Sequence, residues 1–270
     1  MKRIVLITGA SAGIGEETAK FLAQAGFRVY GAARRIDKLT SLKRFGIIPL
    51  QVDVSDAESM VKGVQQILDA EGRIDVLINN AGFGLYGAIE DVAIQKARHQ
   101  FEVNVFGAAR LIQLVLPVMR QHESGTIINI SSVAGKIAAP MSGWYSASKF
   151  AMEGLSDSLR NEVNTFGIRV VLIEPGGIKT EGIGLAANGL IEASGHTAYQ
   201  TMVRQYAKIN QTAEEKSPPP LVIAELIHKV LNTKDPKARY AAGYLARPAL
   251  LMRRMLPDWL FDKLIRQQMK

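Results

Sequence analysis

The chain alternates regularly between short apolar runs and longer stretches with helical spacing, and this alternation constrains its fold more than any other feature. The apolar runs are rich in β-branched residues and cover 4–7, 27–30, 47–51, 76–78, 126–130, 169–173 and 239–242. The stretches with helical spacing lie between them, at 16–25, 55–70, 92–120, 144–166 and 221–231. Uninterrupted apolar strands that alternate with amphipathic helices are typical of a parallel sheet covered on both faces. Because crossovers between parallel strands are right-handed, the pattern predicts a doubly wound α/β fold with seven, mostly parallel strands.

Length and composition indicate one domain. The chain has 270 residues, of which 47% are hydrophobic and 21% charged, as in an ordinary globular protein. We expect a single dinucleotide-binding and catalytic domain over 1–270, because α/β chains of roughly 250 residues commonly form one. Within it, 181–220 lacks strong periodicity and ends in three prolines, which predicts a long loop that is disordered or forms a substrate lid. The segment 244–270 is predicted to be a basic, amphipathic helical extension.

The absence of cysteine excludes several kinds of site. With no Cys in the sequence, a disulfide scaffold, a thiolate zinc site, an iron–sulfur cluster and a cysteine nucleophile are all excluded. The four histidines show neither HxxH nor HExxH spacing, so no metal site is predicted. The first apolar run is shorter than the ~7–15 residues of a signal-peptide core. No uninterrupted apolar run approaches the ~18 residues of a membrane span, so we expect a cytoplasmic protein.

The positive charge is concentrated in one part of the chain. The formal net charge is +8. The last 34 residues contain eight Lys and Arg against two Asp, so six of the net charges belong to them. The remaining body is nearly neutral, which argues against a nucleic-acid groove across the fold. No nucleic-acid partner is predicted.

A glycine-rich turn follows the first apolar run. Gly9, Gly13 and Gly15 lie between a predicted strand and a predicted helix. Glycines let the backbone turn tightly and approach a pyrophosphate, and the helix offers the anion free N–H groups and the positive end of its dipole. A plain loop is the alternative, but the strand–turn–helix context favours a Rossmann dinucleotide site. Ser11 and Ile14 of the same turn are expected to contact the cofactor.

The end of the second predicted strand distinguishes NAD from NADP. An acidic residue about 20 positions beyond the glycines binds the ribose 2′-hydroxyl in NAD-dependent folds. Here the sequence reads Gly-Ala-Ala-Arg-Arg, without a carboxylate. Arg34, helped by Arg35, is placed to pair with a 2′-phosphate, because a guanidinium fork suits phosphate oxygens. The alternative is a pair of solvated arginines, but the sequence favours NADP over NAD.

Tyr145 and Lys149 are four residues apart and therefore share one face of a predicted helix. A phenol with a pKa of ~10 is a poor base at neutral pH, and a neighbouring ammonium favours its phenolate form. Such a tyrosine transfers a proton to or from a carbonyl or alcohol oxygen. Ser132 lies at the end of a predicted strand, thirteen residues upstream, and its hydroxyl is placed to polarise the same oxygen. The YxxxK pattern alone is common by chance.

Taken together, the motifs resemble those of the short-chain dehydrogenase/reductase family, in order and over nearly the whole chain. Each resembles a segment that the family uses to bind the nicotinamide cofactor or to carry out catalysis. The matching segments are Thr8–Gly15 (TGxxxGxG), Asp53-Val54 (the adenine-contacting pair), Asn79-Asn80-Ala81-Gly82 (NNAG), Asn104 (the catalytic Asn), Ser132, Tyr145 and Lys149 (the rest of the tetrad), and Pro175-Gly176-Gly177-Ile178-Lys179-Thr180 (PGxxxT).

The resemblance implies a role for each member of the tetrad. Tyr145 would be the general acid in reduction and the base in oxidation. Lys149 would lower the pKa of Tyr145 and hold the nicotinamide ribose, and Ser132 would stabilise the reacting oxygen. Asn104 would hold a water that links Lys149 to solvent. The cofactor would also be contacted by Asn80, Ala81, Gly82, Pro175, Gly176, Ile178 and Thr180. Many NADP-dependent relatives carry a basic residue where this chain has Ala12, so the NADP preference depends mainly on Arg34.

Residues near the tetrad and in the extension have more than one interpretation. Phe83, Leu85 and Tyr86 either touch substrate or pack at the sheet edge, and Met141 and Trp144 are candidate pocket walls. The basic extension either closes an apolar substrate pocket, lies on an anionic membrane as a peripheral contact, or docks on the body with a solvated basic face. Related enzymes with similar tails include some that act on steroids, retinoids and other lipophilic alcohols.

Two functions are compatible with these observations. The first is an NADP-dependent oxidoreductase that transfers a hydride between NADP(H) and a carbonyl/alcohol pair, with an apolar, steroid-, retinoid- or lipid-like small molecule as substrate. The second is a nucleotide-sensing regulator that keeps the fold without turnover. The intact set of Asn104, Ser132, Tyr145 and Lys149 favours the enzyme, because a sensor does not need it. The resemblance also implies a homo-oligomer, a dimer or tetramer formed through the long helices at 92–120 and 144–166.

Overall fold

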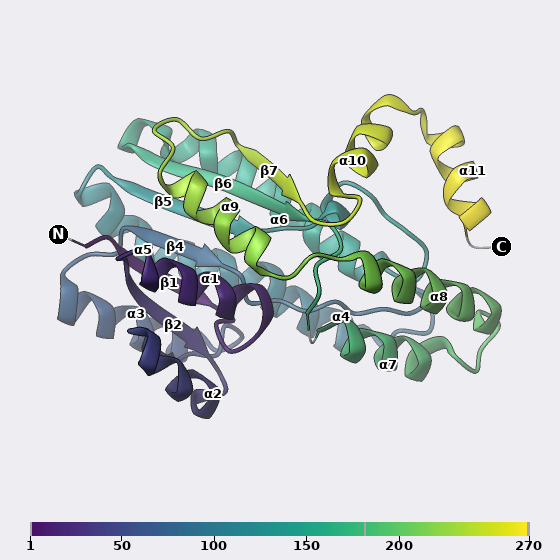
Figure 1. Cartoon of the computed structure of the whole chain (residues 1–270), viewed down its shortest axis with the longest axis horizontal. Helices are drawn as coiled ribbons and strands as arrows, with labels where there is room; N and C mark the ends of the chain where they lie inside the picture. The colour runs from purple at the N-terminus through teal and green to yellow at the C-terminus, as the bar shows by residue number, and fades with distance from the viewer. Residues whose placement is uncertain (1, 181, 269–270) are drawn as a thin grey trace.

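The protein is built around one parallel sheet (Figure 1). The computed structural model describes residues 2–180 and 182–268. For residues 182–186 it describes the backbone only. Met1, Glu181 and residues 269–270, which belong to the predicted domain, lid and extension, lie outside the described residues. The seven strands pair in the order β3-β2-β1-β4-β5-β6-β7, and every pairing is parallel. The strands are β1 (Ile4–Thr8), β2 (Arg28–Ala33), β3 (Ile48–Gln51), β4 (Val76–Asn79), β5 (Gly125–Ile130), β6 (Ile168–Pro175) and β7 (Arg239–Ala242).

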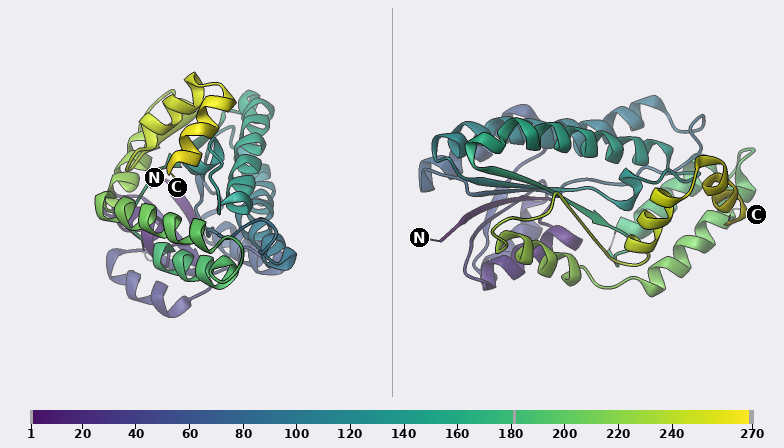
Figure 2. Two further views of the ribbon diagram at one scale, coloured as in Figure 1. Left: turned by 90° about the vertical axis from the view of Figure 1, so that its right-hand side faces the viewer. Right: turned by 90° about the horizontal axis from the view of Figure 1, so that it is seen from above.

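Helices cover both faces of this sheet, as the layered views in Figure 2 show. The α-helices are α1 (Gly13–Gln24), α2 (Ile36–Thr40), α3 (Ala57–Glu71), α4 (Ile94–Phe101), α5 (Gly107–Gln121), α6 (Gly143–Val163), α7 (Gly182–Ser194), α8 (Gln200–Lys216), α9 (Leu221–Leu231), α10 (Ala246–Met255) and α11 (Asp258–Gln268). Shorter turns are η1 (Ser41–Phe45), η3 (Val133–Gly135) and η4 (Asn164–Phe166), which are 3₁₀-helices, and η2 (Glu102–Phe106), a π-helix.

The central strand β1 shows why the sheet needs two helical layers. All five of its residues are buried. Ile4 and Leu6 pack into one apolar core with residues of α3, α5 and α6, whereas Val5 and Ile7 pack into a second core with residues of α1, α2 and α9. Successive side chains of a strand point to opposite faces, so a continuous apolar run buries every side chain only when both faces are covered. The doubly wound fold predicted from the sequence is confirmed.

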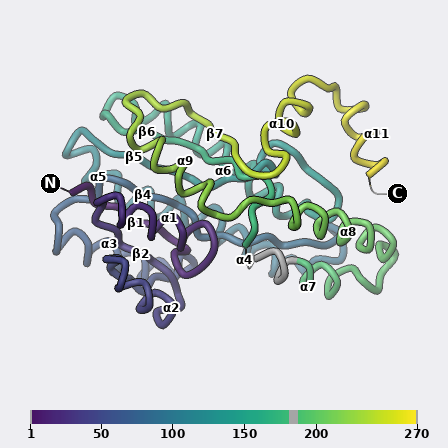
Figure 3. The backbone as a smooth tube through the Cα atoms, in the orientation of Figure 1, coloured from purple at the N-terminus to yellow at the C-terminus, as the bar shows by residue number. Residues whose placement is uncertain are grey.

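The strand order reverses between β1 and β4, and this reversal places the site. In a doubly wound sheet the loops diverge at such a point and leave a crevice beyond the carboxyl ends of the strands. Here β1 ends at Thr8 and β4 ends at Asn79, so we expect the crevice beyond these two residues. The helices α7, α8, α10 and α11 gather beyond this edge of the sheet (Figure 1). The backbone trace places the two chain ends at opposite ends of the molecule (Figure 3).

Most predicted elements match the structure closely, and the predictions for 92–120 and 181–220 differ from it. The predictions at 221–231 and 239–242 coincide with α9 and β7, and the other strands differ by a few residues at their ends. The stretch 92–120 was predicted as one helix, but it is divided into α4, the π-turn η2 and α5.

The prediction of a long loop over 181–220 was wrong, because α7 and α8 occupy most of it. Their glycine, alanine and polar residues mask the helical pattern. Tyr199, Met202, Val203 and Tyr206 nevertheless follow the i, i+3, i+4, i+7 spacing of a helix face. They pack with Leu190 and other residues in a small apolar cluster, so tertiary packing stabilises helices that propensity alone does not predict.

One helical stretch has the composition of a membrane span. Within the described part of the chain, Ile94–Gln121 is long and apolar enough to cross a membrane, with a mean hydropathy of 1.4 and 39% of its best window buried. In the structure, Leu111, Val115 and Met119 of α5 pack against the sheet. A core helix of a water-soluble protein passes the same test of length and composition. More than half of the window nevertheless faces outward.

Candidate functional site

The glycine turn after β1 has the backbone conformations that only glycine adopts easily. Gly9 and Gly13 have φ of +68° and +57°, in the left-handed region. A Cβ on Gly15 would lie 2.4 Å from the carbonyl oxygen of Gly9, so no larger residue fits there. A Cβ on Gly13 would lie 3.3 Å from Cγ2 of Thr180. The structure therefore brings the first glycine turn and the segment after β6 together.

The turn is fixed to the end of β4 through hydrogen bonds of Thr8 and Asn80. The Thr8 hydroxyl oxygen accepts from the backbone N–H groups of Asn80 at 3.0 Å and Ala81 at 2.9 Å. Asn80 Nδ2 in turn donates to the Thr8 carbonyl at 2.9 Å. The two segments that flank the crevice therefore form one rigid unit. The predicted contacts Gly9, Asn80 and Ala81 lie within it.

The start of α1 fits an anionic group. Its N-cap residue, Ala12, has extended backbone and provides no side-chain hydrogen bond to the first turn. The N–H groups at this end are therefore open to a phosphate, as at other helix N-termini that bind anions. The close approach that Gly9, Gly13 and Gly15 allow makes this the place for a pyrophosphate. Ser11 and Ile14 lie in the same turn.

Arg34 and Arg35 are both exposed where β2 ends. Arg35 Nη2 donates to the hydroxyl of Ser11 at 3.1 Å, so this arginine reaches across to the glycine turn. Asp53 lies nearby, after β3. Burial alone would raise the pKa of Asp53, but hydrogen bonds from the hydroxyl and N–H of Ser55, at 2.6 and 2.9 Å, and the charge of Arg34 hold it below its usual value. The arrangement gives two guanidinium groups and one ionised carboxylate around the expected adenosine position.

Asn104 is buried in the π-turn η2 and is held by three hydrogen bonds. Its Oδ1 accepts from the N–H of Phe83 at 3.0 Å, and its Nδ2 donates to the Phe83 carbonyl at 3.0 Å and to the Ser148 hydroxyl at 3.1 Å. A Cβ on Gly82 would lie 3.0 Å from the same Oδ1. The π-turn thus connects the segment after β4 with α6. Single π-turns inside α-helices are frequent at functional sites.

Ser132, Tyr145 and Lys149 come together beyond β5. Ser132 caps η3, where its hydroxyl accepts from the N–H of Ala134 at 3.1 Å, and it is also within hydrogen-bond reach of the Tyr145 phenol. Lys149 is 7% exposed. Its Nζ donates to the Ile130 carbonyl at 2.8 Å and lies 5.8 Å from the centre of the Tyr145 ring. The structure therefore brings three members of the predicted tetrad, Ser132, Tyr145 and Lys149, together at the carboxyl edge of the sheet.

The protonation of this group differs from the sequence-based expectation that Lys149 lowers the pKa of Tyr145. Burial raises the pKa of Tyr145, and the Ser132 hydroxyl acts in the opposite direction. Burial also lowers the pKa of Lys149 to about 8, against the attraction of the Glu153 carboxylate. The physical reason is the burial of the phenol, and the Lys149 ammonium donates to a backbone carbonyl rather than to the phenol.

The segment after β6 is braced by the loop that follows β7. Gly176 N–H donates to the Ala242 carbonyl at 2.9 Å, and Gly177 and Tyr244 exchange hydrogen bonds of 3.1 and 2.9 Å. Gly176 admits no side chain, because a Cβ would lie 2.3 Å from the Tyr244 carbonyl oxygen. The brace extends the sheet edge up to Ile178, which is 5% exposed. Pro175, Gly176, Ile178 and Thr180 therefore lie in or directly after β6, at the carboxyl edge of the sheet.

An aromatic and apolar cluster lies next to Tyr145. The ring of Tyr86 lies 5.7 Å from that of Tyr145 and 5.8 Å from that of Tyr206 in α8. Tyr86 and Tyr206 pack in one apolar cluster with Met141, and the cluster also contains Ala88, Leu190, Tyr199, Met202 and Val203. Of the open interpretations, Tyr86 and Met141 thus belong to this lining, whereas Phe83 stacks on His99 at 5.7 Å. Trp144 has a buried Nε1 that meets no acceptor among the described residues. The residues of α7 and α8 were missed by the sequence analysis, although their helical spacing was a usable signal.

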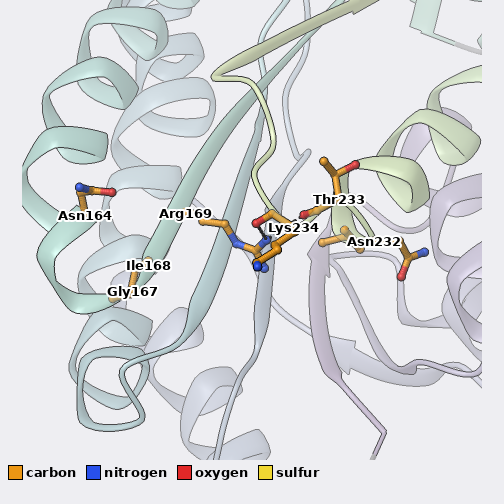
Figure 4. Close-up of a pocket in the computed structure, with 8 residues that line it drawn as sticks. Asn164, Gly167, Ile168, Arg169, Asn232, Thr233 and Lys234 are labelled. Carbon is orange, nitrogen blue, oxygen red and sulfur yellow. Dashed lines mark hydrogen bonds between the residues drawn. The ribbon is translucent and has the colours of Figure 1, made fainter.

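A separate hollow of about 660 Å³ lies at the opposite, amino-terminal edge of the sheet (Figure 4). Its lining includes Arg169, whose Nη1 donates to the carbonyls of Thr233 at 3.0 Å and Lys234 at 3.2 Å. This guanidinium therefore already has backbone acceptors. Ligands of doubly wound sheets bind at the carboxyl edge, and we assign no ligand to this hollow. Within residues 2–180 and 182–268, no group of three or more His, Asp or Glu is placed to hold a metal ion.

Comparison with known proteins agrees with this geometry. The profile of the family described as short chain dehydrogenase matches residues 3–191. The chain belongs to the short-chain dehydrogenase family. It is 36% identical to the 3-ketodihydrosphingosine reductase of Bacteroides thetaiotaomicron, over 99% of this chain and 97% of the relative. It is 35% identical to the NADPH-dependent 3-dehydrocapnine reductase of Ornithobacterium rhinotracheale, over 99% and 98%.

The structures agree as well. A short-chain dehydrogenase from Streptomyces avermitilis superposes with a TM-score of 0.83 at 32% identity, covering 98% of this chain and 96% of that one. This short-chain dehydrogenase is therefore an oxidoreductase with the nucleotide-binding fold of its family, and the enzymes of this family act on small molecules. The resemblance inferred from the motifs is confirmed.

Proposed function

We propose that the protein is an NADP-dependent enzyme that interconverts a ketone and a secondary alcohol on an apolar small molecule. The observation that carries this proposal is the group formed by Ser132, Tyr145 and Lys149, which is enclosed by the apolar lining of Tyr86 and Tyr206. An acid–base tyrosine beside an apolar enclosure suits proton transfer to a carbonyl oxygen of a molecule with little charge.

The roles of the four residues follow from their contacts. Tyr145 donates its phenolic proton to the substrate oxygen in reduction and takes it back in oxidation. The Ser132 hydroxyl, within reach of that phenol, hydrogen-bonds the same oxygen. Lys149 supplies positive charge below the phenol and holds the nicotinamide ribose. Asn104, fixed by three hydrogen bonds, holds the turn through which a proton reaches Lys149 from solvent.

The cofactor-binding residues divide by the part of NADP they would hold. Gly9, Ser11, Gly13, Ile14 and Gly15 hold the pyrophosphate at the start of α1. Arg34 and Arg35 would hold the 2′-phosphate, and Asp53 and Val54 would hold the adenine. Asn80, Ala81 and Gly82 would hold the adjacent ribose. The nicotinamide side would be held by Tyr145, Lys149, Pro175, Gly176, Ile178 and Thr180. Bound NADP(H) supplies the hydride chemistry, and the protein supplies its placement. The contact of Arg35 with Ser11 and the NADPH-dependent relative support NADP over NAD.

The substrate class is supported by the relatives and by the lining. Two relatives are named as reductases of a 3-keto and a 3-dehydro compound. The apolar cluster next to Tyr145 provides aromatic rings and methionine side chains. We propose a ketone carried by a long apolar chain, with α7 and α8 as the lid above it.

The assembly and the surroundings of the enzyme form a second part of the proposal. Phe106 of η2 and Phe150 of α6 are 56% and 45% exposed, and they provide an apolar face for a homo-oligomer along α5 and α6, which light scattering would detect. On α10 and α11, Met255 and Trp259 are 71% and 68% exposed beside a basic tail, which supports peripheral contact of a cytoplasmic protein with an anionic membrane.

The experiment is a turnover assay with matched variants. Purified protein is mixed with NADPH and either 3-ketodihydrosphingosine or 3-dehydrocapnine, and the loss of NADPH absorbance is followed. We expect turnover, and a loss of about 10²–10⁴-fold in Tyr145→Phe because the proton donor is removed. Tyr145→Phe should retain NADPH binding. Binding without turnover in the native protein would favour the alternative of a nucleotide-sensing regulator, and unchanged turnover in the variant would remove Tyr145 from the mechanism.

A further inference from the structure

A pair of buried carboxyl groups lies behind the proposed catalytic residues. Glu153 of α6 is 2% exposed and Glu174 of β6 is 4% exposed. The two side chains are in hydrogen-bond contact with each other. Each has a buried Oε1 atom that finds no hydrogen-bond donor among the described residues. Two adjacent carboxyl groups in a poorly solvated place are costly to ionise together, and one proton between them satisfies both.

Cations from two other segments hold this pair. Arg239 of β7 donates its Nε to Glu153 Oε2 at 2.9 Å, and the same Nε lies 3.5 Å from Glu174 Oε1. Lys136, directly after η3, lies 3.1 Å from Glu153 Oε2. Arg239 also donates to Asp157 Oδ2 at 2.5 Å, but that carboxylate is 40% exposed. Glu153 is therefore the buried carboxylate with two cationic partners.

Glu174 is the member of the pair that holds a proton below about pH 7. Burial and the neighbouring charge of Glu153 raise the pKa of Glu174 to about 7, although Arg239 and Lys136 act in the opposite direction. Both cations contact Glu153 Oε2, so they stabilise a carboxylate at that oxygen. A carboxylate with two cationic partners is thus held inside the protein close to the tetrad.

Glu153 is connected to the tetrad through α6 and η3. It follows Lys149 by four residues, so the two side chains lie on the same face of the helix. A Cβ on Gly135 would lie 2.9 Å from Glu153 Cγ and 3.2 Å from the Lys149 carbonyl oxygen. Glu153 therefore packs under the turn that Ser132 caps. Its charge favours the protonated form of Lys149 against burial.

We propose that Glu153 is a positioning residue of the reaction, whose buried carboxylate, fixed by Arg239 and Lys136, keeps Lys149 in its ammonium form behind Tyr145. Loss of this negative charge favours neutral Lys149. The Lys149 ammonium must then lose its proton at lower pH. The inference depends on the proposed function for its catalytic meaning, but its test needs no substrate.

The test is a pH titration of the Lys149 side chain, followed by NMR in protein labelled at its lysines. Each variant is measured with and without Lys149→Met, and the difference isolates the signal of Lys149 from those of the other lysines. We expect Glu153→Gln to shift the midpoint down by about 0.5–1 pH unit, the size expected for one partly screened charge. Glu153→Asp, which keeps the charge, should restore most of the shift.

Asp157→Asn is the matched control. Asp157 lies one turn further along α6 and also binds Arg239, but it is 40% exposed. Its loss should weaken the Arg239 contact without moving the midpoint. Equal shifts in Glu153→Gln and Asp157→Asn, or no shift in either, would overturn the proposal and leave Glu153 as a structural link between α6, β6 and β7.

A further variant covers the case in which Glu153→Gln does not fold. Lys136 is 36% exposed at its side chain, so Lys136→Met should fold. Removal of this cation leaves the charge of Glu153 less compensated and should move the midpoint upward, and an unchanged midpoint would contradict the proposal. A shifted midpoint without turnover of any ketone would contradict the proposed function alone. Turnover without a shift in Glu153→Gln would contradict the role of Glu153 alone.

Discussion

The layer of residues at the carboxyl edge of the sheet and the helical shell above it are held in different ways. Thr8, Asn80 and Asn104 make paired hydrogen bonds to backbone groups, and Lys149 is anchored to a strand carbonyl. The shell of α7, α8, α10 and α11 depends instead on small apolar clusters, and it leaves several large apolar side chains exposed.

This difference separates chemistry from selectivity. Buried hydrogen bonds fix atoms within tenths of an ångström, which proton and hydride transfer require. Apolar contacts are less directional and tolerate changes of shape. Substitutions in the inner layer should therefore change the reaction or the cofactor, whereas substitutions in the shell should change which molecules are bound.

The largest effect among the remaining variants is expected at the inner layer. Arg34→Ala removes the charged hydrogen-bond donor proposed to bind the 2′-phosphate and should raise the Kd for NADPH about 10–100-fold, with little change for NADH. Fluorescence titration with both nucleotides measures it. Arg44→Ala, which removes an exposed arginine stacked on Phe45, is the control. An equal loss for NADPH and NADH would show that Arg34 does not read the phosphate.

A smaller effect is expected in the shell. Tyr206→Ala removes the ring next to Tyr86 and should raise KM for a long-chain ketone about tenfold, the scale of one lost aromatic contact, while kcat stays nearly constant. Tyr206→Phe keeps the ring and should behave like the native protein. Steady-state kinetics with a long and a short ketone separate the two variants. A fall in kcat with unchanged KM would instead assign Tyr206 to the inner layer.

The smallest effect is expected at the exposed tail. The double substitution Met255→Ser and Trp259→Ser removes two exposed apolar groups and should reduce binding to anionic vesicles about three- to tenfold. Vesicle flotation measures the binding, and neutral vesicles serve as the control. Turnover of a water-soluble ketone should not change. Equal flotation of the native and substituted proteins would exclude α10 and α11 as the contact surface.

The sequence predicted the inner layer better than the shell. Gly9, Asn80 and Ser132 lie just beyond the ends of apolar strands, so a parallel sheet brings them to one edge whatever the remaining details are. Tyr145 lies in the first turn of α6, which follows the last of these strands. The family resemblance added Asn104, which no spacing argument reaches. The positions of these residues are determined by the sheet and were predictable.

The shell and the buried carboxyl pair were not predictable in the same way. Tyr206 faces Tyr86 only because α8 folds back over the site, and the weakly amphipathic sequence of 181–220 does not specify that path. In the sequence alone, Glu153 has the pattern of a surface residue on an amphipathic helix. It is buried because β6 and β7 place Glu174 and Arg239 against it. Such contacts join three segments that are distant along the chain, so no local sequence pattern predicts them.

The π-turn at Glu102–Phe106 affects how relatives of this protein should be aligned. A π-turn contains one more residue per turn than the helix around it, so the helix beyond it is rotated with respect to the helix before it. The apolar face of α5 is therefore out of phase with that of α4, although both read as one hydrophobic stretch. An alignment that treats the stretch as an uninterrupted α-helix would slip by one position near Asn104. A one-residue deletion in this turn should therefore displace Asn104 from Phe83 and Ser148, although it alters no other residue of the site.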